Sequence, residues 1–191
     1  YRNQARLLLS QSKAAEALEK AQLGYAQSRE DSECSLVLAA CLQANQRDSE
    51  ALPLIERILA GKPNYAEAYA NRAFIKLRAN DTLGAIEDLE MTVSLKPHLT
   101  QIWRFLGNAR YKSNNLLGAI EALKRARDNA PGNSAVMIQL GELLLKNSNV
   151  SEATNLFEQA RVLAPDEPNV WANLGIASQQ EKKVASAKIF F

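Results

Sequence analysis

The sequence lacks several features that would each define a class of protein. Its 2 cysteines are too few for the disulfide framework of a small secreted domain. No apolar stretch approaches the ~18–20 residues of a membrane span, since the short run Leu143-Leu144-Leu145 ends at Lys146. The formal net charge is only +2 in 191 residues. We therefore expect neither nucleic-acid binding nor direct membrane insertion.

Residue patterns that carry catalysis or metal binding are also missing. The chain has 1 histidine, His98, which follows Pro97 in an expected turn and has no companion ligands at metal spacing. Its 8 glycines are scattered and form no phosphate-binding loop. The carboxylates of Glu87, Asp88 and Glu90 are expected on exposed helix faces. We predict no catalytic, cofactor or metal site, and hence no enzyme.

The two cysteines are expected to be small buried residues. Cys34 and Cys41 are separated by 7 positions, which places them about 10 Å apart along one helix axis. A disulfide needs Cα atoms within about 7 Å, so we expect both thiols to be free. The sequence leaves the compartment open: a cytoplasmic location is favoured, and a periplasmic one is the alternative if a signal peptide has been removed.

What the sequence does contain is a period of 34 residues. Four of its 6 prolines recur at that spacing: Pro63, Pro97, Pro131 and Pro165. We number repeat positions from 1 to 34, with these prolines at position 32. Position 20 is then always alanine: Ala17, Ala51, Ala85, Ala119, Ala153 and Ala187. Position 8 is always small: Ala5, Ala39, Ala73, Gly107, Gly141 and Gly175.

Each period predicts two helices, A and B. Positions 4, 7, 8 and 11 lie on one face of helix A, and positions 20, 24 and 27 lie on one face of helix B. Asn, Asp and Ser cluster between them, as in Asn80-Asp81, and predict a turn. Thr100 and Ser134 are expected N-caps, and Pro168 suits a first helical position.

On these residues the chain resembles the tetratricopeptide repeat (TPR) family. The motif is carried by Trp103, Leu106 and Gly107, by Trp171, Leu174 and Gly175, and by Ala119, Leu123 and Pro131. The resemblance implies an all-α superhelix, a solenoid of stacked antiparallel helix pairs with about five and a half repeats. The predicted single array covers 1–191, with a divergent repeat at 1–31, full repeats at 32–65, 66–99, 100–133 and 134–167, and a truncated one at 168–191.

Three departures from the repeat raise separate expectations. Arg72 stands where other repeats have leucine, so its head either reaches solvent or pairs with an acid of the groove or of another repeat. Pro53 falls within a helix B and is expected to shift its start or kink it. The chain ends at Lys188-Ile189-Phe190-Phe191, midway through an expected helix B. We therefore expect either a piece of a longer protein or a disordered remainder beyond this point, and we hypothesise that the isolated segment self-associates through its uncapped end.

The resemblance implies that the A helices line a concave groove. The residues we assign to a peptide-binding site there are Asn71, Phe74, Arg78, Arg104, Phe105, Asn108, Lys112, Gln139, Lys146 and Asn173. Amides can pair with an extended peptide backbone, aromatic rings can anchor it, and the cations favour an acidic ligand. The alternative for Arg78, Lys112 and Lys146 is that they only offset the dipoles of solvated helix ends.

The predicted function is a non-catalytic scaffold that binds a protein or peptide segment in this groove. One alternative is a substrate-recruiting region of a larger enzyme such as a glycosyltransferase. Another is a bacterial export or envelope assembly factor. The sequences on either side of this segment would separate the three.

Overall fold

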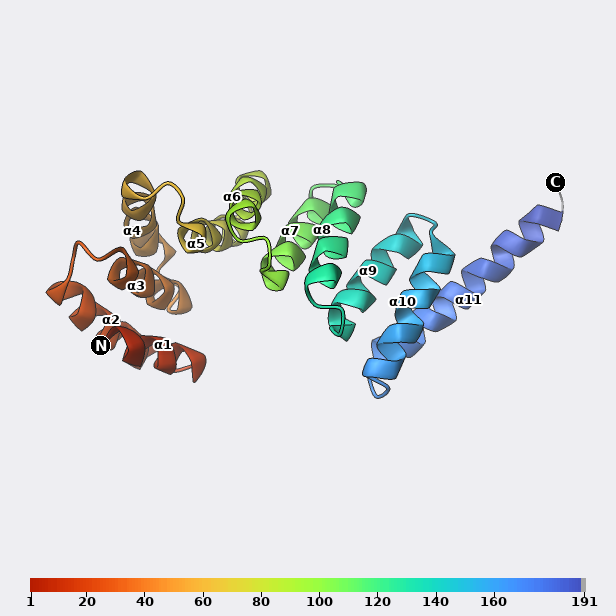
Figure 1. Cartoon of the computed structure of the whole chain (residues 1–191), viewed down its shortest axis with the longest axis horizontal. Helices are drawn as coiled ribbons and strands as arrows, with labels where there is room; N and C mark the ends of the chain where they lie inside the picture. The colour runs from red at the N-terminus through yellow and green to blue at the C-terminus, as the bar shows by residue number, and fades with distance from the viewer. Residues whose placement is uncertain (190–191) are drawn as a thin grey trace. The chain divides into compact units, whose positions relative to one another are not determined.

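The computed structural model describes the backbone of residues 1–189 and the side chains of residues 1–182. Within these residues every regular element is an α-helix (Figure 1), which confirms the all-α fold class. The helices are α1 (Arg2–Ser10), α2 (Ala14–Gln27), α3 (Ser32–Ala44), α4 (Asp48–Gly61), α5 (Ala66–Arg78), α6 (Thr82–Leu95), α7 (Thr100–Lys112), α8 (Leu116–Asn129), α9 (Ser134–Lys146), α10 (Val150–Leu163) and α11 (Pro168–Ile189).

The helices fall into two compact units, which we describe separately. Unit 1 is Tyr1–Pro97 and unit 2 is His98–Phe191. In unit 1 the apolar core runs from Ala5 of α1 to Ile75 of α5. In unit 2 it runs from Ala119 of α8 to Ala177 of α11. The single array over 1–191 therefore stays a prediction.

Helix starts follow the 34-residue period closely. The A helices α3, α5, α7, α9 and α11 each begin at position 1 of a repeat, and the B helices α4, α6, α8 and α10 each begin at position 17. Pro53 lies inside α4 and is exposed, yet α4 starts in register and has the same 14 residues as α6. The expected shift of the helix start is therefore wrong.

The turn between A and B helices has a fixed backbone geometry. One residue in each turn adopts a left-handed conformation with φ near +60°, and these residues recur every 34 positions: Ser12, Gln46, Asn80, Asn114 and Ser148. Asparagine tolerates this region better than most non-glycine residues. The predicted turns are thus confirmed, and each is closed by a single left-handed residue.

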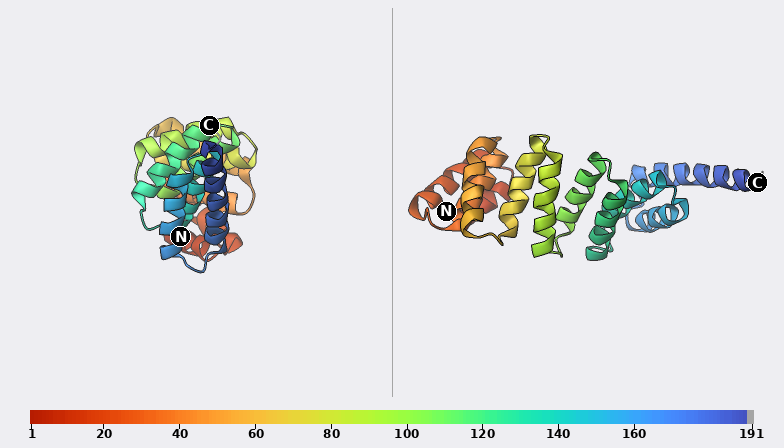
Figure 2. Two further views of the ribbon diagram at one scale, coloured as in Figure 1. Left: turned by 90° about the vertical axis from the view of Figure 1, so that its right-hand side faces the viewer. Right: turned by 90° about the horizontal axis from the view of Figure 1, so that it is seen from above.

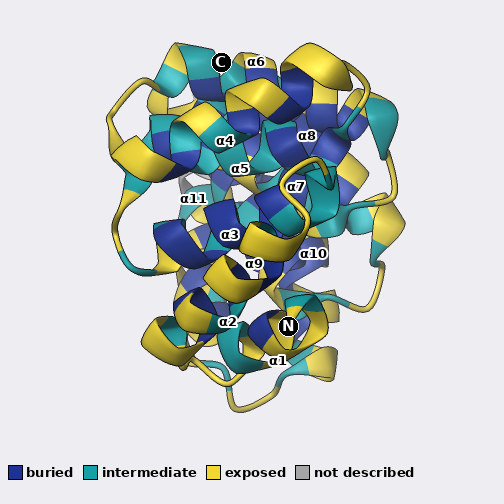
Figure 3. Ribbon diagram, turned by 90° about the vertical axis from the view of Figure 1, so that its left-hand side faces the viewer, coloured by how far each residue is buried: buried dark blue, intermediate teal, exposed yellow. Residues whose placement is uncertain are grey.

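Small residues let paired helices approach closely, as the sequence predicted. Ala51, Ala85, Ala119 and Ala153 have no exposed surface. In unit 2, a Cβ on Gly141 would lie 2.5 Å from Cε1 of Phe157, so only glycine leaves room for that ring. Burying a side chain as large as Phe157 contributes about 1.5–3 kcal/mol. Buried and exposed residues accordingly alternate along the helices (Figure 3).

Two helix starts differ by one residue from the predicted caps. Thr100 and Ser134 are the first residues of α7 and α9 rather than their N-caps. The cap of α9 is Asn133, whose side-chain oxygen accepts a hydrogen bond from the Val136 amide. Pro168 does begin α11, where its missing N–H costs no hydrogen bond.

Helix α11 combines what the sequence predicts as an A helix, a turn and the start of a B helix. It runs from Pro168 to Ile189 without interruption (Figure 2). The helix therefore continues through Lys182, where the 34-residue period places the turn between helices A and B in the other repeats. Phe190, Phe191 and the side chain of Ala187 lie outside the described residues.

Candidate functional site

The A-helix face of unit 2 gathers most of the residues assigned to the groove. It comprises side chains of α7, α9 and α11: Arg104, Phe105, Asn108, Tyr111, Lys112, Gln139, Glu142, Lys146, Asn173 and Ile176. They lie together because positions 5, 6, 9, 12 and 13 share one side of an A helix. A hydrogen bond between α7 and α9 is consistent with this arrangement. Nε of Arg104 donates to Oε1 of Gln139 over 2.9 Å, and its Nη1 donates to Gln101 over 3.2 Å.

A second contact joins α7 to α9 at the C-terminal ends of these helices. Nζ of Lys146 lies 5.5 Å from the centroid of the Tyr111 ring. Interaction with the Tyr111 hydroxyl raises the pKa of Lys146 above its ordinary value. Lys146 therefore remains a cation at neutral pH. Lys112, one residue beyond Tyr111, is exposed to solvent, so two cations lie at this end of the face.

Between α9 and α11 the same face contains a recess of about 260 Å³. Nδ2 of Asn173 donates to Oε1 of Glu142 over 3.1 Å and links the two helices there. Asn173 itself is only 8% exposed. The apolar part of the lining comes from Leu145 and Ile176, and Ile176 is 46% exposed. The recess thus combines an open apolar surface with polar groups that donate and accept hydrogen bonds.

Part of this lining was missed by the assignment from sequence. Glu142 and Ile176 both occupy position 9, the position of Phe74 and Asn108, which were assigned. Their helical position was a sufficient signal. The assignment from sequence contains amides, aromatic rings and cations, whereas a carboxylate and an isoleucine also line this recess.

In unit 1 the assigned residues make different contacts. The backbone carbonyl of Asn71 accepts a hydrogen bond from Nε2 of Gln43 over 3.1 Å, which joins α3 to α5. Arg78 is bound at both ends of its guanidinium by Asp48, with N–O distances of 2.6 Å. Its charge is thus already paired within unit 1. Phe74 is half-buried in α5.

Arg72 pairs with an acid of its own repeat, contrary to both expectations for it. Its Nη2 and Nε lie 2.7 and 2.9 Å from the carboxylate of Asp88 on α6. Nζ of Lys76 is 2.9 Å from the same carboxylate. Asp88 is 2% exposed, so its predicted exposure is wrong, whereas Glu87 and Glu90 are exposed as predicted. Hydrogen bonding to Asp88 raises the pKa of Arg72. We call Arg72, Lys76 and Asp88 the charged triad.

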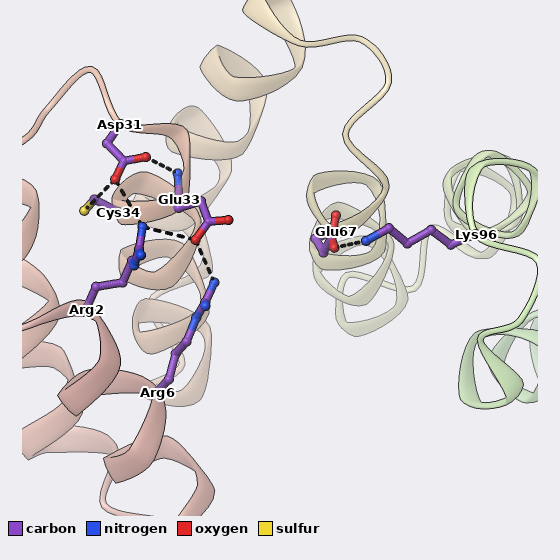
Figure 4. Close-up of polar contacts among 7 residues, drawn as sticks. All are labelled: Arg2, Arg6, Asp31, Glu33, Cys34, Glu67 and Lys96. Carbon is purple, nitrogen blue, oxygen red and sulfur yellow. Dashed lines mark hydrogen bonds and ion pairs between the residues drawn. The ribbon is translucent and has the colours of Figure 1, made fainter.

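The N-terminal ends of α1 and α3 carry a further group of polar contacts (Figure 4). Arg2 and Arg6 reach Glu33 with N–O distances of 3.2 and 3.4 Å. Asp31 caps α3, since its Oδ1 accepts from the Glu33 amide over 2.9 Å. That backbone hydrogen bond, followed by the one from Cys34, lowers the pKa of Asp31. Exposed pairs of this kind contribute about 0–1 kcal/mol each.

On α5, Glu67 pairs with Lys96, the residue that follows α6 (Figure 4). This contact joins the start of an A helix to the end of its own B helix. It is a contact within one repeat, and it contributes to the structure of the repeat rather than to a site.

Both cysteines are free, as predicted. Burial raises the pKa of Cys41 to about 11, and Cys34 also has a raised pKa, through burial and then through its hydrogen bond to Asp31. Cys34 is only half-buried, which differs from the expectation. Both thiols stay protonated at neutral pH, so neither is an activated nucleophile.

In the described part of the chain, no group of three His, Cys, Asp or Glu residues is arranged to hold a metal ion. None of its helices has both the length and the apolar character that crossing a bilayer requires.

Comparisons with known proteins agree with this architecture. Two models of the tetratricopeptide repeat match the sequence, one over residues 70–134 and the other over residues 110–175. Together they span more than half of the chain. No curated protein gives a significant match.

Solved structures share the fold at low sequence identity. MamA from Desulfovibrio magneticus RS-1 is 21% identical, with a TM-score of 0.73 over 88% of this chain and 95% of its own. YrrB, described as a TPR protein with an unusual peptide-binding site, is 18% identical, with a TM-score of 0.77 over 86% of this chain and 85% of its own. A chain of the APC/C hetero-tetramer Cut9-Hcn1 is 20% identical, with a TM-score of 0.72 over 95% of this chain and 36% of its own. With its period, its helix pairs and these matches, the chain belongs to the tetratricopeptide repeat family.

Proposed function

We propose that the chain is a non-catalytic interaction module, and that the A-helix face of unit 2 binds an extended segment of a partner protein. The observation that carries this proposal is the recess between α9 and α11. Its volume of about 260 Å³ is below the roughly 300–1,000 Å³ of pockets that enclose small-molecule ligands. A recess of this size suits one side chain of a longer ligand that continues across the face.

The chemistry of the face supports a peptide as that ligand. Exposed Ile176 offers apolar surface to an inserted side chain, and the amides of Gln139 and Gln180 can donate to and accept from a peptide backbone. Phe105 is 39% exposed and Tyr111 40%, so both present ring surface for contact. The similarity in fold to YrrB, described as having a peptide-binding site, is consistent with this use of the fold.

Lys112 and Lys146 favour a ligand with acidic residues near one end. Both lie at the C-terminal ends of their helices, on the same side of unit 2. An acidic side chain there would gain attraction that falls with added salt. The contribution of Arg78, already paired with Asp48, is expected to be small.

Selection of binding peptides from a random display library tests the proposal directly. We expect selected peptides to lose at least about tenfold in affinity for an Ile176→Arg variant, because a buried charge would occupy the recess. The matched control is Val162→Arg on α10, a B-helix residue of the same unit that is 76% exposed. Equal affinity for wild type and the Ile176→Arg variant would contradict the assignment.

A further inference from the structure

Unit 1 contains a second recess, away from the A-helix face. It has a volume of about 370 Å³ and lies between the segment that precedes α3, the start of α3 and the C-terminal half of α4. Its lining includes Arg29, Glu30, Ser35, Arg57 and Lys62. None of these residues contributes to the proposed peptide site.

The recess arises where the sequence departs from its own repeat. Position 4 carries a large side chain in the later repeats, namely Tyr69, Trp103, Met137 and Trp171. In repeat 32–65 the residue at this position is Ser35, which is 2% exposed. A small side chain here leaves space against α4 that the other repeats fill with a large one.

A second departure places a cation at the same recess. Position 32 is proline in the four repeats from 32 to 167, but the equivalent residue before α3 is Arg29. Both departures, Arg29 and Ser35, line the recess. The small side chain of Ser35 provides volume, and Arg29 provides positive charge.

The charges around the recess are not compensated as they are elsewhere in unit 1. The arginines of this unit are Arg2, Arg6, Arg29, Arg47, Arg57, Arg72 and Arg78. Five of them form ion pairs with carboxylates. Arg29 and Arg57 form none among the described residues, and both line the recess.

Arg57 is nevertheless held in place. Its Nη2 donates to the Tyr25 hydroxyl over 2.7 Å, and its guanidinium carbon lies 5.6 Å from the centroid of that ring. Nζ of Lys62 lies 5.9 Å from the Tyr65 ring centroid. These aromatic contacts orient the cations without neutralising them.

We propose that this recess binds a phosphate monoester group. Three cations and Glu30 give the lining a charge of +2, and a phosphate monoester carries about −1.5 to −2 at neutral pH. Guanidinium groups match phosphate oxygens with paired hydrogen bonds, and Arg29 and Arg57 can each supply such a pair. The volume exceeds that of the anion alone, which leaves room for the group that carries it.

Chemical-shift titration of the ¹⁵N-labelled 191-residue chain tests the proposal. The probes are inorganic phosphate, O-phosphoserine and a short glycine-flanked phosphoserine peptide, with the unphosphorylated peptide as blank. Titrations are run in about 0.15 M NaCl to screen non-specific attraction. We expect saturable shifts at the amides of Ser32, Ser35 and Gly61, and none with the blank.

Variants locate the binding. Arg29→Gln and Arg57→Gln should each weaken phosphoserine binding at least about tenfold. Ser35→Tyr introduces the residue type that the next repeat has at this position, Tyr69. It should abolish phosphoserine binding by filling the recess. The matched control is Arg125→Gln, because Arg125 has the same repeat position in unit 2 as Arg57 has in unit 1.

Several results would overturn the proposal. These are the absence of saturable shifts, equal weakening by Arg125→Gln and Arg57→Gln, or undiminished binding to a Ser35→Tyr variant whose circular dichroism shows it to be folded. If the proposal holds, the probes also identify the source of the group. Tighter binding of the phosphopeptide than of inorganic phosphate indicates a phosphorylated protein, whereas equal binding of the two would contradict a monoester as the ligand.

Discussion

Two repeats of this chain fold alike around different interiors. Repeat 66–99 in unit 1 joins α5 to α6 through the charged triad of Arg72, Lys76 and Asp88. Repeat 134–167 in unit 2 has leucine at the same three positions: Leu140, Leu144 and Leu156. Asp88 is 2% exposed and Leu156 is 4% exposed, so the residue at position 23 is buried in both repeats.

The comparison shows what the repeat requires at these positions. Both repeats keep alanine at position 20 and a large apolar residue at position 24, namely Leu89 and Phe157. Those positions determine how closely the helices approach. The three variable positions only have to be filled by side chains that suit one another, through apolar contact in one repeat and through ion pairs to a shared carboxylate in the other.

The largest effect is expected from breaking the charged triad at its centre. Asp88→Ala leaves Arg72 and Lys76, each with a side chain 25% exposed, without their acid. The free energy of unfolding should fall by about 3 kcal/mol. Urea denaturation followed by circular dichroism measures this, with amide exchange in α5 and α6 to locate it.

Glu87→Ala is the matched control for that experiment. Glu87 is the exposed neighbour of Asp88 on α6, and its loss should change the free energy of unfolding by no more than about 0.5 kcal/mol. Equal effects of the two variants would mean that the triad contributes no specific stability.

Replacing the whole triad should have the opposite sign. The combined variant Arg72→Leu, Lys76→Leu and Asp88→Leu gives repeat 66–99 the residues of repeat 134–167. Removing all three charges avoids their desolvation cost and should raise the free energy of unfolding by about 1–4 kcal/mol. A combined variant less stable than wild type would show that α5 and α6 cannot accommodate the leucines.

The two glycines at position 8 should differ in their tolerance of alanine. A Cβ on Gly141 would meet a Phe157 ring carbon at 2.5 Å, whereas a Cβ on Gly107 would meet Cγ of Leu123 at 3.0 Å. Gly141→Ala should therefore cost about 1–3 kcal/mol, and Gly107→Ala less. Both tryptophans, Trp103 and Trp171, lie in unit 2, so their fluorescence follows its unfolding. Equal costs would contradict this order.

The smallest effects concern two helix caps. Asp31 caps α3 in unit 1 and Asn133 caps α9 in unit 2. Replacing either by alanine should cost about 1 kcal/mol at pH 7. The pKa of Asp31 is lowered on folding, so its contribution is present above its ordinary value of 3.8 and is lost as the pH falls through the folded value.

Denaturation of both cap variants between pH 7 and pH 2 separates the two cases. The difference between wild type and Asp31→Ala should shrink at the acidic end, because the wild-type carboxylate becomes protonated. The difference for Asn133→Ala should stay constant over that range, since an amide does not titrate. Parallel pH dependence of the two differences would argue against Asp31 as a charged cap.

Much of the fold could be predicted from the sequence because the period repeats each constraint several times. Ala51, Ala85, Ala119 and Ala153 gave four independent indications of one close helix contact. The turn at Asn80 was equally well supported by its counterparts. A single motif would have been compatible with several folds, whereas its repetition along the chain was compatible with one.

Residues that break the period were harder to predict. The burial of Asp88 follows from Arg72 and Lys76 only when all three positions are compared with their leucine counterparts. The recess beside Ser35 exists because this position lacks the large side chain of the later repeats. A serine by itself does not indicate a recess. Helix α11 continues through Lys182 although the aligned residues elsewhere adopt left-handed turns. The assigned groove residues stay a prediction, because a face can be located from periodicity but its ligand cannot.

The regular spacing of the left-handed residues that close the turns also indicates which insertions and deletions the fold can tolerate. From Asn80 to Asn114, and again from Asn114 to Ser148, the backbone passes through one B helix, a linker and one A helix. Duplicating or deleting a segment between two such residues would return every side chain to an equivalent face. A single inserted residue inside α8 would instead rotate Leu123 by about 100° away from Gly107. Whole repeats are therefore the natural unit of insertion and loss in this chain.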